Sequence, residues 1–184
     1  MNRLRLFALA ATALLLAAFA APMTAETFGP EDRAAVQARI DHLDGMMRAG
    51  DLAGAIDVVP PRLLQAIADR AGLPKDQLRA LMREQISGML ENITVVSFDM
   101  DLDAAPPLTT PDGSRTYLLV PMDLVLKVEG VGKMRARGHT LALEDEGQWY
   151  LIRVEDAPQI AFVRELWPEF AEVEFPAGTT EAVD

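Results

Sequence analysis

The stretch YLLVPMDLVLKVEGVGKMRARGHTLALEDEGQWYLIRV, residues 117–154, decides the fold of this chain. Apolar and polar side chains alternate along most of it, which is typical of β-strands with one buried face. Glycine-containing turn sequences interrupt the alternation twice, so we predict an antiparallel meander with short hairpin loops. With one strand before the stretch, the strands are expected at about 93–103, 115–129, 133–144 and 148–155.

Charge pairing and apolar pairing between neighbouring strands predict the register of both hairpins. A three-residue loop at 130–132 would place Asp123 beside His139. A three-residue loop at 145–147 would place His139 beside Arg153. The two registers together predict a row of Asp123, His139 and Arg153 across three strands.

The same registers divide the remaining strand residues between two faces of the sheet. The first face is expected to pack against helices, and its third strand contributes small side chains there. Small side chains beneath large ones would leave an apolar ligand pocket, and a tightly filled core is the alternative. The residues predicted for the pocket are Met122, Leu124, Gly138, Thr140, Tyr150 and Ile152.

The second face is predicted to end in an apolar patch. An exposed patch of this kind would bind a second copy of the chain or another protein. Alternatively, a helix near the C-terminus would cover it and leave the chain a monomer. The patch consists of Leu141, Leu143, Trp149 and Leu151.

The first half of the chain predicts helices, because apolar residues recur there at helical spacing. Proline is expected at helix starts and glycine just after helix ends. A short helix between Asp156 and Pro168 follows the strands. We therefore predict an α+β fold in which N-terminal helices pack on a curved antiparallel four-stranded meander. The N-terminal helices are expected at about 30–50, 51–59 and 61–72, with a last one beginning at 74.

Helices followed by a curved meander, with the hairpin sequence GQWYLIRV at 147–154, resemble the NTF2-like (cystatin-like α+β cone) superfamily. The resemblance implies a pocket between the helices and the concave sheet face, and dimers that pack through the back of the sheet. Members of this superfamily include isomerases, dehydratases, hydrolases and non-catalytic binding proteins. The chain departs from the family pattern by lacking a short strand pair among its helices and by adding a terminal helix.

Acid–base catalysis is the main alternative to simple binding. A carboxylate that orients an imidazole can support proton transfer, and Asp123 with His139 offers this combination, with Arg153 alongside. The resemblance implies such a role for Asp and His on inward-facing strand positions. The predicted registers place the row on the second face, away from the pocket, so a structural row of ion pairs is favoured. If the chain is an enzyme, a lyase, isomerase or hydrolase is expected.

The sequence offers little for a metal or another cofactor, and we expect none. FDMDLD at 98–103 has the spacing that opens a calcium loop, but Ala104 and Thr110 stand where such a loop needs glycine and glutamate. The alternation of carboxylates with apolar residues instead predicts a solvated strand face. The chain has no cysteine, which excludes disulfides and thiolate metal sites.

The N-terminus predicts export. Arg3 and Arg5 precede an apolar run, which small residues follow, so we assign 1–20 to a secretory signal peptide. Cleavage is expected after Ala20 or Ala25, and an uncleaved anchor is the alternative. A linker at 21–29, a single domain at 30–175 and a disordered tail at 176–184 would complete the chain.

The composition narrows the class of partner. The net charge of −11 repels phosphate backbones and argues against nucleic-acid binding. After signal cleavage no segment is expected in the membrane. The sequence therefore favours a periplasmic or secreted, non-catalytic binding or accessory protein for a small apolar ligand, with a homodimer or a protein partner expected.

Overall fold

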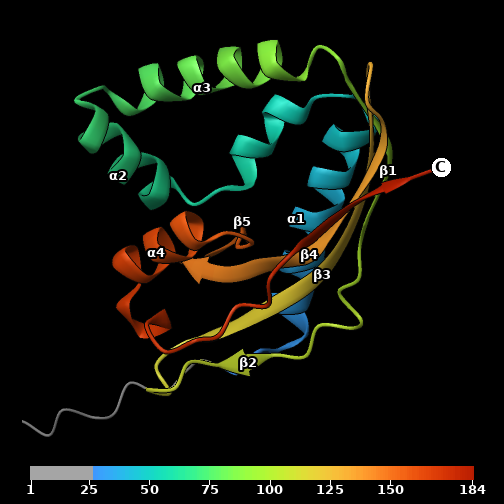
Figure 1. Ribbon diagram of the computed structural model, residues 1–184. Helices are drawn as coiled ribbons and strands as arrows, with labels where there is room; N and C mark the ends of the chain where they lie inside the picture. The colour runs from blue at the N-terminus through green and yellow to red at the C-terminus, as the bar shows by residue number, and fades with distance from the viewer. Residues whose placement is uncertain (1–26) are drawn as a thin grey trace, which may run out of the picture.

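Two long antiparallel strands form the centre of a curled sheet (Figure 1). The computed structural model describes residues 27–184, so the expected signal peptide, its cleavage position and most of the expected linker lie outside the described residues. Each central strand has two shorter strands along its outer edge. The central strands are β3 (Thr116–Val128) and β4 (Gly132–Asp145). The strands beside β3 are β1 (Ile93–Met100) and β2 (Leu108–Thr109); those beside β4 are β5 (Gln148–Arg153) and β6 (Thr179–Val183).

The helices precede and follow the strands in the expected order. Prolines stand in the first turns of α1, α2 and α4, and Gly72 ends α2 with a left-handed φ of 65°. The predicted α+β class, with helices before a curled antiparallel sheet and a short helix after it, is confirmed. The helices are α1 (Pro30–Arg48), η1 (Leu52–Val58), α2 (Pro61–Ala71), α3 (Lys75–Leu90), α4 (Ala157–Leu166) and η2 (Pro168–Phe170). Within residues 27–184, no helix combines the length and the apolar composition that crossing a membrane requires.

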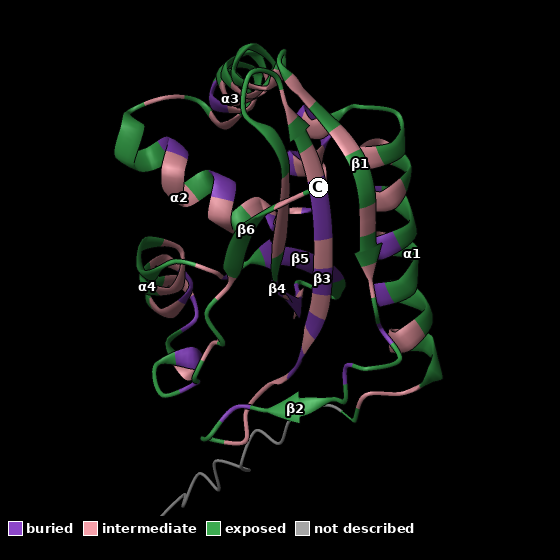
Figure 2. Cartoon of the chain, turned by 45° about the vertical axis from the view of Figure 1, so that its right-hand side comes forward, coloured by how far each residue is buried: buried purple, intermediate pink, exposed green. Residues whose placement is uncertain are grey.

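One face of the sheet packs against α1 and η1. Val36, Ile40 and Leu43 form the buried stripe of α1, which faces the sheet in Figure 2. Their spacing follows the helical period, so a single helix face supplies this side of the core. The strand residues in the same cluster are Leu118, Val120, Ala142, Trp149 and Leu151.

The opposite face is covered by the C-terminal segment. Trp167 and Phe170 lie almost wholly inside this second cluster, and the Phe170 ring meets Tyr117 edge to face at 5.2 Å between centroids. The covering helix and the segment after it therefore supply a second core rather than a peripheral addition. The residues buried beneath them include Leu141 and Leu143 of β4, Ile152 of β5 and Val154, which follows β5.

The register of the β3–β4 hairpin differs from the prediction by two residues. Val128 pairs with Gly132 and Asp123 pairs with Arg137, whereas Asp123 was expected beside His139. The observed loop is 129–131, one residue nearer the N-terminus than the predicted loop at 130–132. Gly130 and Gly132 both have positive φ. Left-handed backbone geometry favours glycine, so the turn outweighs the charge pairing used for the prediction. A shift of two residues leaves every side chain on its expected face.

The register of the β4–β5 hairpin differs by one residue, and this reverses β5. The loop contains only Glu146 and Gly147, with φ values of 53° and 77°. Two residues at positive φ are the mark of a type I′ turn, whose twist suits a tight hairpin. Consequently, Trp149, Leu151 and Arg153 share the face of Thr140 and Ala142, while Ile152 joins the opposite core.

The predicted apolar patch is not an exposed surface. Its four residues are 0%, 0%, 7% and 3% exposed for Leu141, Leu143, Trp149 and Leu151. The reversal of β5 splits them, so that Leu141 and Leu143 lie beneath the C-terminal segment while Trp149 and Leu151 face α1. For Leu141 and Leu143, the alternative prediction, that a helix near the C-terminus covers the patch, is therefore the correct one. The surface from which a homodimer interface was expected is buried within the chain.

The expectation of a disordered tail at 176–184 is also wrong. Residues Thr179–Val183 form β6, which pairs antiparallel with the part of β4 that β5 leaves free. Lys133 pairs with Val183 and Arg137 pairs with Thr179, while the Arg137 side chain also bonds Glu181 at 2.9 Å. Because the tail is polar and alternates weakly, backbone pairing along an open edge is what orders it.

Removing residues 179–184 should expose the β4 edge at 133–137. We expect amide hydrogen exchange within 133–137 to accelerate, while amides of Thr140 and Leu143, which β5 still covers, keep their rates. Hydrogen-exchange mass spectrometry of the full and shortened chains measures this. Equal exchange rates at 133–137 in both chains would contradict the pairing.

Phe170→Ala should destabilise the protein by about 3–5 kcal/mol, because a large aromatic side chain at 0% exposure is removed from a packed cluster. Met89→Ala, at a site 78% exposed, is the matched control and should change the free energy of unfolding by less than about 0.5 kcal/mol. Urea unfolding followed by tryptophan fluorescence compares the two. A loss below about 1 kcal/mol for Phe170→Ala would show that the C-terminal segment is not part of the core.

Candidate ligand-binding cavity

An apolar cavity of about 320 Å³ lies between the C-terminal end of α1, η1 and the sheet. Three residues predicted for a pocket line it: Met122, Leu124 and Thr140. The remaining lining residues are Leu43, Met47, Leu52, Ala55, Val58, Val59, Leu90, Phe98, Leu126, Leu151 and Arg153.

Small residues in η1 leave part of this space open. Its sequence LAGAIDV places Ala53, Gly54 and Ala55 in succession, and Ala55 lines the cavity. A side chain at Gly54 would force Asp51 and Met46 to shift, because a Cβ atom there would lie 2.5 Å from Asp51 Oδ2 and 2.6 Å from Met46 Sδ. The 3-10 helix therefore approaches α1 closely but extends few atoms toward the sheet.

Helix α3 covers the region only loosely. It lies above η1 in Figure 1 and has one buried residue, Leu78. Arg79 and Arg83 hold it to Asp57 of η1 through ion pairs. Its last residue, Leu90, reaches the cavity, so one wall comes from a helix that packs on η1 and α2 rather than on the sheet.

The other predicted pocket residues lie elsewhere. A Cβ atom at Gly138 would stand 2.5 Å from Glu155 Oε1, so the Glu155 side chain occupies the space that the glycine leaves. Tyr150 and Ile152 belong to the side of β5 that the type I′ turn directs away from the cavity. Arg153, expected on the opposite face, enters the lining for the same reason.

The polar end of the cavity is formed by Thr140 and Arg153, which pair directly across β4 and β5. The Arg153 guanidinium donates to a single oxygen of Glu155, from Nε at 2.6 Å and from Nη2. The other oxygen, Glu155 Oε1, is buried and has no hydrogen-bond partner among the described residues. Glu155 thus fixes the orientation of the guanidinium.

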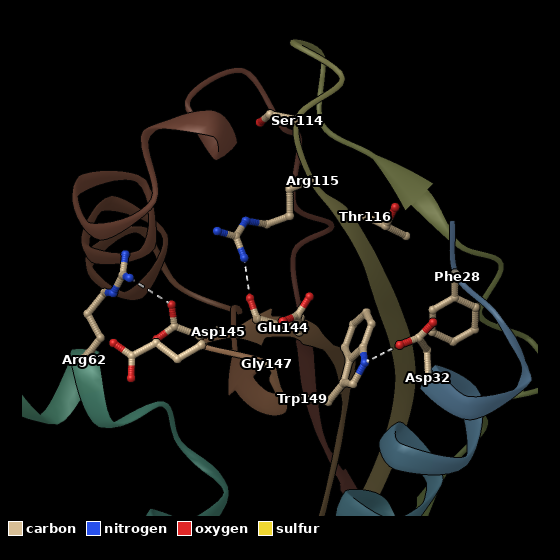
Figure 3. Close-up of a pocket in the computed structure, with 11 residues that line it drawn as sticks. Phe28, Asp32, Arg62, Ser114, Arg115, Thr116, Glu144, Asp145, Gly147 and Trp149 are labelled. Carbon is tan, nitrogen blue, oxygen red and sulfur yellow. Dashed lines mark hydrogen bonds and ion pairs between the residues drawn. The ribbon is translucent and has the colours of Figure 1, made fainter. Parts of the chain in front are cut away.

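A second, polar cavity of about 380 Å³ lies at the opposite end of α1 (Figure 3). There Asp32 accepts hydrogen bonds from Trp149 Nε1 at 3.1 Å and from the Gly29 backbone N–H at 2.8 Å. Phe28 meets the Trp149 ring edge to face at 5.5 Å between centroids. These contacts anchor the start of α1 to β5.

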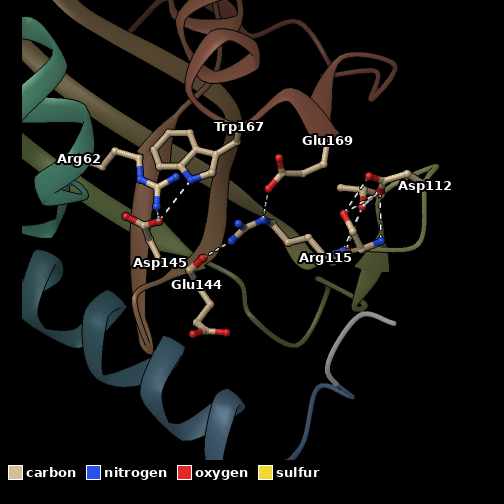
Figure 4. A network of polar contacts seen from close by, with 9 residues as sticks. Arg62, Asp112, Arg115, Glu144, Asp145, Trp167 and Glu169 are labelled. Carbon is tan, nitrogen blue, oxygen red and sulfur yellow. Dashed lines mark hydrogen bonds and ion pairs between the residues drawn. The ribbon is translucent and has the colours of Figure 1, made fainter. Parts of the chain in front are cut away.

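Both arginines that line the polar cavity are held in ion pairs (Figure 4). Asp145, which is 4% exposed, forms an ion pair with Arg62 at 3.2 Å and accepts a hydrogen bond from Trp167 Nε1 at 3.4 Å. Arg115 donates to Glu169 at 2.6 Å and also to the Glu144 backbone carbonyl. The network ties α2, the β4–β5 hairpin and η2 together, which is a structural role.

Beside this network, a loop is closed by Asp112. Thr110 and Ser114 donate hydrogen bonds to its carboxylate at 2.7 Å and 2.9 Å. Because these bonds favour the charged form, they hold the pKa of Asp112 below its ordinary value. The loop positions Arg115 at the beginning of β3.

The predicted row of Asp123, His139 and Arg153 is not formed, because the β5 register places Arg153 on the other face. Asp123 is held by Arg135 and Arg137, each at 3.1 Å. His139 lies opposite Pro121, and its Nδ1 atom is buried without a hydrogen-bond partner among the described residues. Asp123 and His139 line one shallow hollow, but no hydrogen bond joins them as an acid–base pair requires.

The aspartates of FDMDLD have separate local roles. Strand β1 ends at Met100, and Asp101 accepts a hydrogen bond from the Ala104 backbone N–H at 3.0 Å. Asp103 pairs with Arg33 of α1. Across residues 27–184, no group of three or more His, Cys, Asp or Glu side chains has an arrangement that could hold a metal ion.

Sequence reasoning missed the helix residues of the cavity and the position of Arg153. The helical spacing of apolar residues indicated that Leu43 and Met47 face the core, but it did not indicate that they line a cavity. The register of β5 could have been predicted from the dipeptide Glu146-Gly147, since a residue pair ending in glycine suits a two-residue hairpin loop.

Comparison with known proteins finds no family model, no curated protein and no solved structure that matches the chain. The α+β architecture, a curled antiparallel sheet packed against helices, is compatible with an NTF2-like cone.

Proposed function

We propose that this chain is an exported, non-catalytic binding protein of NTF2-like architecture that holds one small apolar molecule. The observation that carries the proposal is the cavity beside η1, where apolar side chains of α1, η1, α3 and three strands surround about 320 Å³. Ligand pockets are mostly apolar with a few placed polar groups, and this volume lies at the small end of their range. The predicted signal peptide supplies the argument for export.

The location of the cavity also supports the proposal. In an NTF2-like cone the pocket lies between the helices and the sheet, and this cavity occupies that position. A concave space of this size, bordered by apolar side chains such as Leu124, Val58 and Leu151, is typical of small-molecule sites and favours a bound molecule.

An enzymatic alternative would need Asp123 and His139 beside the bound molecule. Neither residue lines the apolar cavity, and Asp123 is engaged by two arginines. The arrangement therefore favours binding over proton transfer.

Ala55→Phe tests the proposal by filling the cavity from η1. The neutral dye N-phenyl-1-naphthylamine should bind the unchanged chain and become fluorescent, and Ala55→Phe should weaken its binding at least about tenfold by removing the space. Ala80→Phe, the same substitution at an exposed position of α3, is the control and should bind the dye as the unchanged chain does. Circular dichroism confirms that each variant is folded.

Two outcomes of the dye titration would overturn the proposed function. One is that the unchanged chain leaves the dye unbound. The other is that folded Ala55→Phe binds the dye as tightly as Ala80→Phe does.

A further inference from the structure

The chemistry of the cavity wall narrows the kind of molecule that would bind. Among the described residues that line it, only Thr140 and Arg153 interrupt the apolar wall, and Arg153 carries the one charge. Because the two residues are direct partners across antiparallel strands, their Cβ atoms are about 5 Å apart on the same face of the sheet. The polar groups are therefore gathered at one place rather than scattered around the wall.

Hydrogen-bond donors dominate this place. A guanidinium carries five N–H groups, and Glu155 accepts bonds from Nε and Nη2 of Arg153. Arg153 Nη1 and the Thr140 hydroxyl make no hydrogen bond to any described residue. A ligand group at this end would therefore meet a cation and a hydroxyl, both able to donate.

A carboxylate matches these donors. It accepts hydrogen bonds through two oxygens and donates none, and a charge-assisted bond to a guanidinium is stronger than a neutral one. The Arg153 side chain is 52% exposed, so it stands at the mouth of the cavity with the apolar wall behind it. The head group would then remain near water while the apolar part enters.

The volume limits the apolar part. At about 30 Å³ for a group the size of a water molecule, the cavity of about 320 Å³ has room for roughly ten such groups, each comparable in size to one methylene of an alkyl chain. This corresponds to a medium-length alkyl chain rather than to a long-chain lipid.

We infer that the ligand is an amphiphilic carboxylate of medium chain length, whose carboxylate binds Arg153 and Thr140 and whose alkyl chain fills the cavity beside η1. The inference rests on the proposed function and adds the class of ligand. Glu155 acts as a positioning residue, because its carboxylate holds the guanidinium plane while Nη1 remains free for the ligand.

Competition with the bound dye tests the class of ligand, using decanoate, 1-decanol and decyltrimethylammonium at pH 7. These probes share a ten-carbon chain and differ in head group. Decanoate should displace the dye at a concentration at least about tenfold lower than decanol, because it gains a charge-assisted bond to Arg153. The cationic probe should be the weakest of the three, since it places a like charge beside the guanidinium.

Arg153→Gln should abolish the preference for decanoate while leaving decanol binding within about twofold. Arg135→Gln is the matched control, because Arg135 pairs with Asp123 on the opposite face and should keep the full preference. Thermal unfolding establishes that both variants fold, and the comparison of the three probes on the unchanged chain holds even if Arg153→Gln does not fold.

The outcomes separate the two proposals. If decanol binds and decanoate binds no better, or if Arg153→Gln keeps the preference, the carboxylate inference fails while the apolar binding function stands. If neither the dye nor any probe binds, both fail.

Discussion

The two left-handed residues of the β4–β5 turn are the constraint on which the rest of the structure depends. Glu146 and Gly147, at φ values of 53° and 77°, close the hairpin with a two-residue loop. A loop one residue longer would turn every β5 side chain to the opposite face. With the observed loop, Trp149 and Leu151 complete the core beneath α1, Ile152 completes the core beneath α4, and Arg153 reaches the cavity.

The small sheet supports two cores because two short strands share the outer edge of each central strand. Strands β3 and β4 are long enough for each to pair with two short strands on its outer side, and the segments between those short strands are free to cross a face. The segment from α4 to η2 leaves after β5, covers one face and returns as β6. On the other face α1 seals the middle with Val36 and Ile40, which separates a polar cavity at its start from an apolar one at its end.

Local patterns predicted much of the fold. Helical spacing, prolines and glycines placed the helices, and alternation placed the four strands of the meander, because these signals lie within a few residues of one another. Register was harder, since it depends on a competition between turn geometry and side-chain pairing. The predicted β3–β4 register was wrong by two residues, so Asp123 still lies on its expected face. The predicted β4–β5 register was wrong by one residue, so Arg153 lies on the opposite face. The pairing of β6 could not be predicted from the sequence, because the unpaired backbone groups of an open sheet edge can bond a strand of almost any side-chain composition.

Ligand binding beside η1 requires an open apolar cavity there, and diffraction from crystals pressurised with xenon can detect it. Xenon enters apolar cavities without needing polar contacts. We expect a xenon peak bounded by Val58, Leu124 and Leu151. Side chains closed over that space, with no xenon density between them, would contradict this expectation.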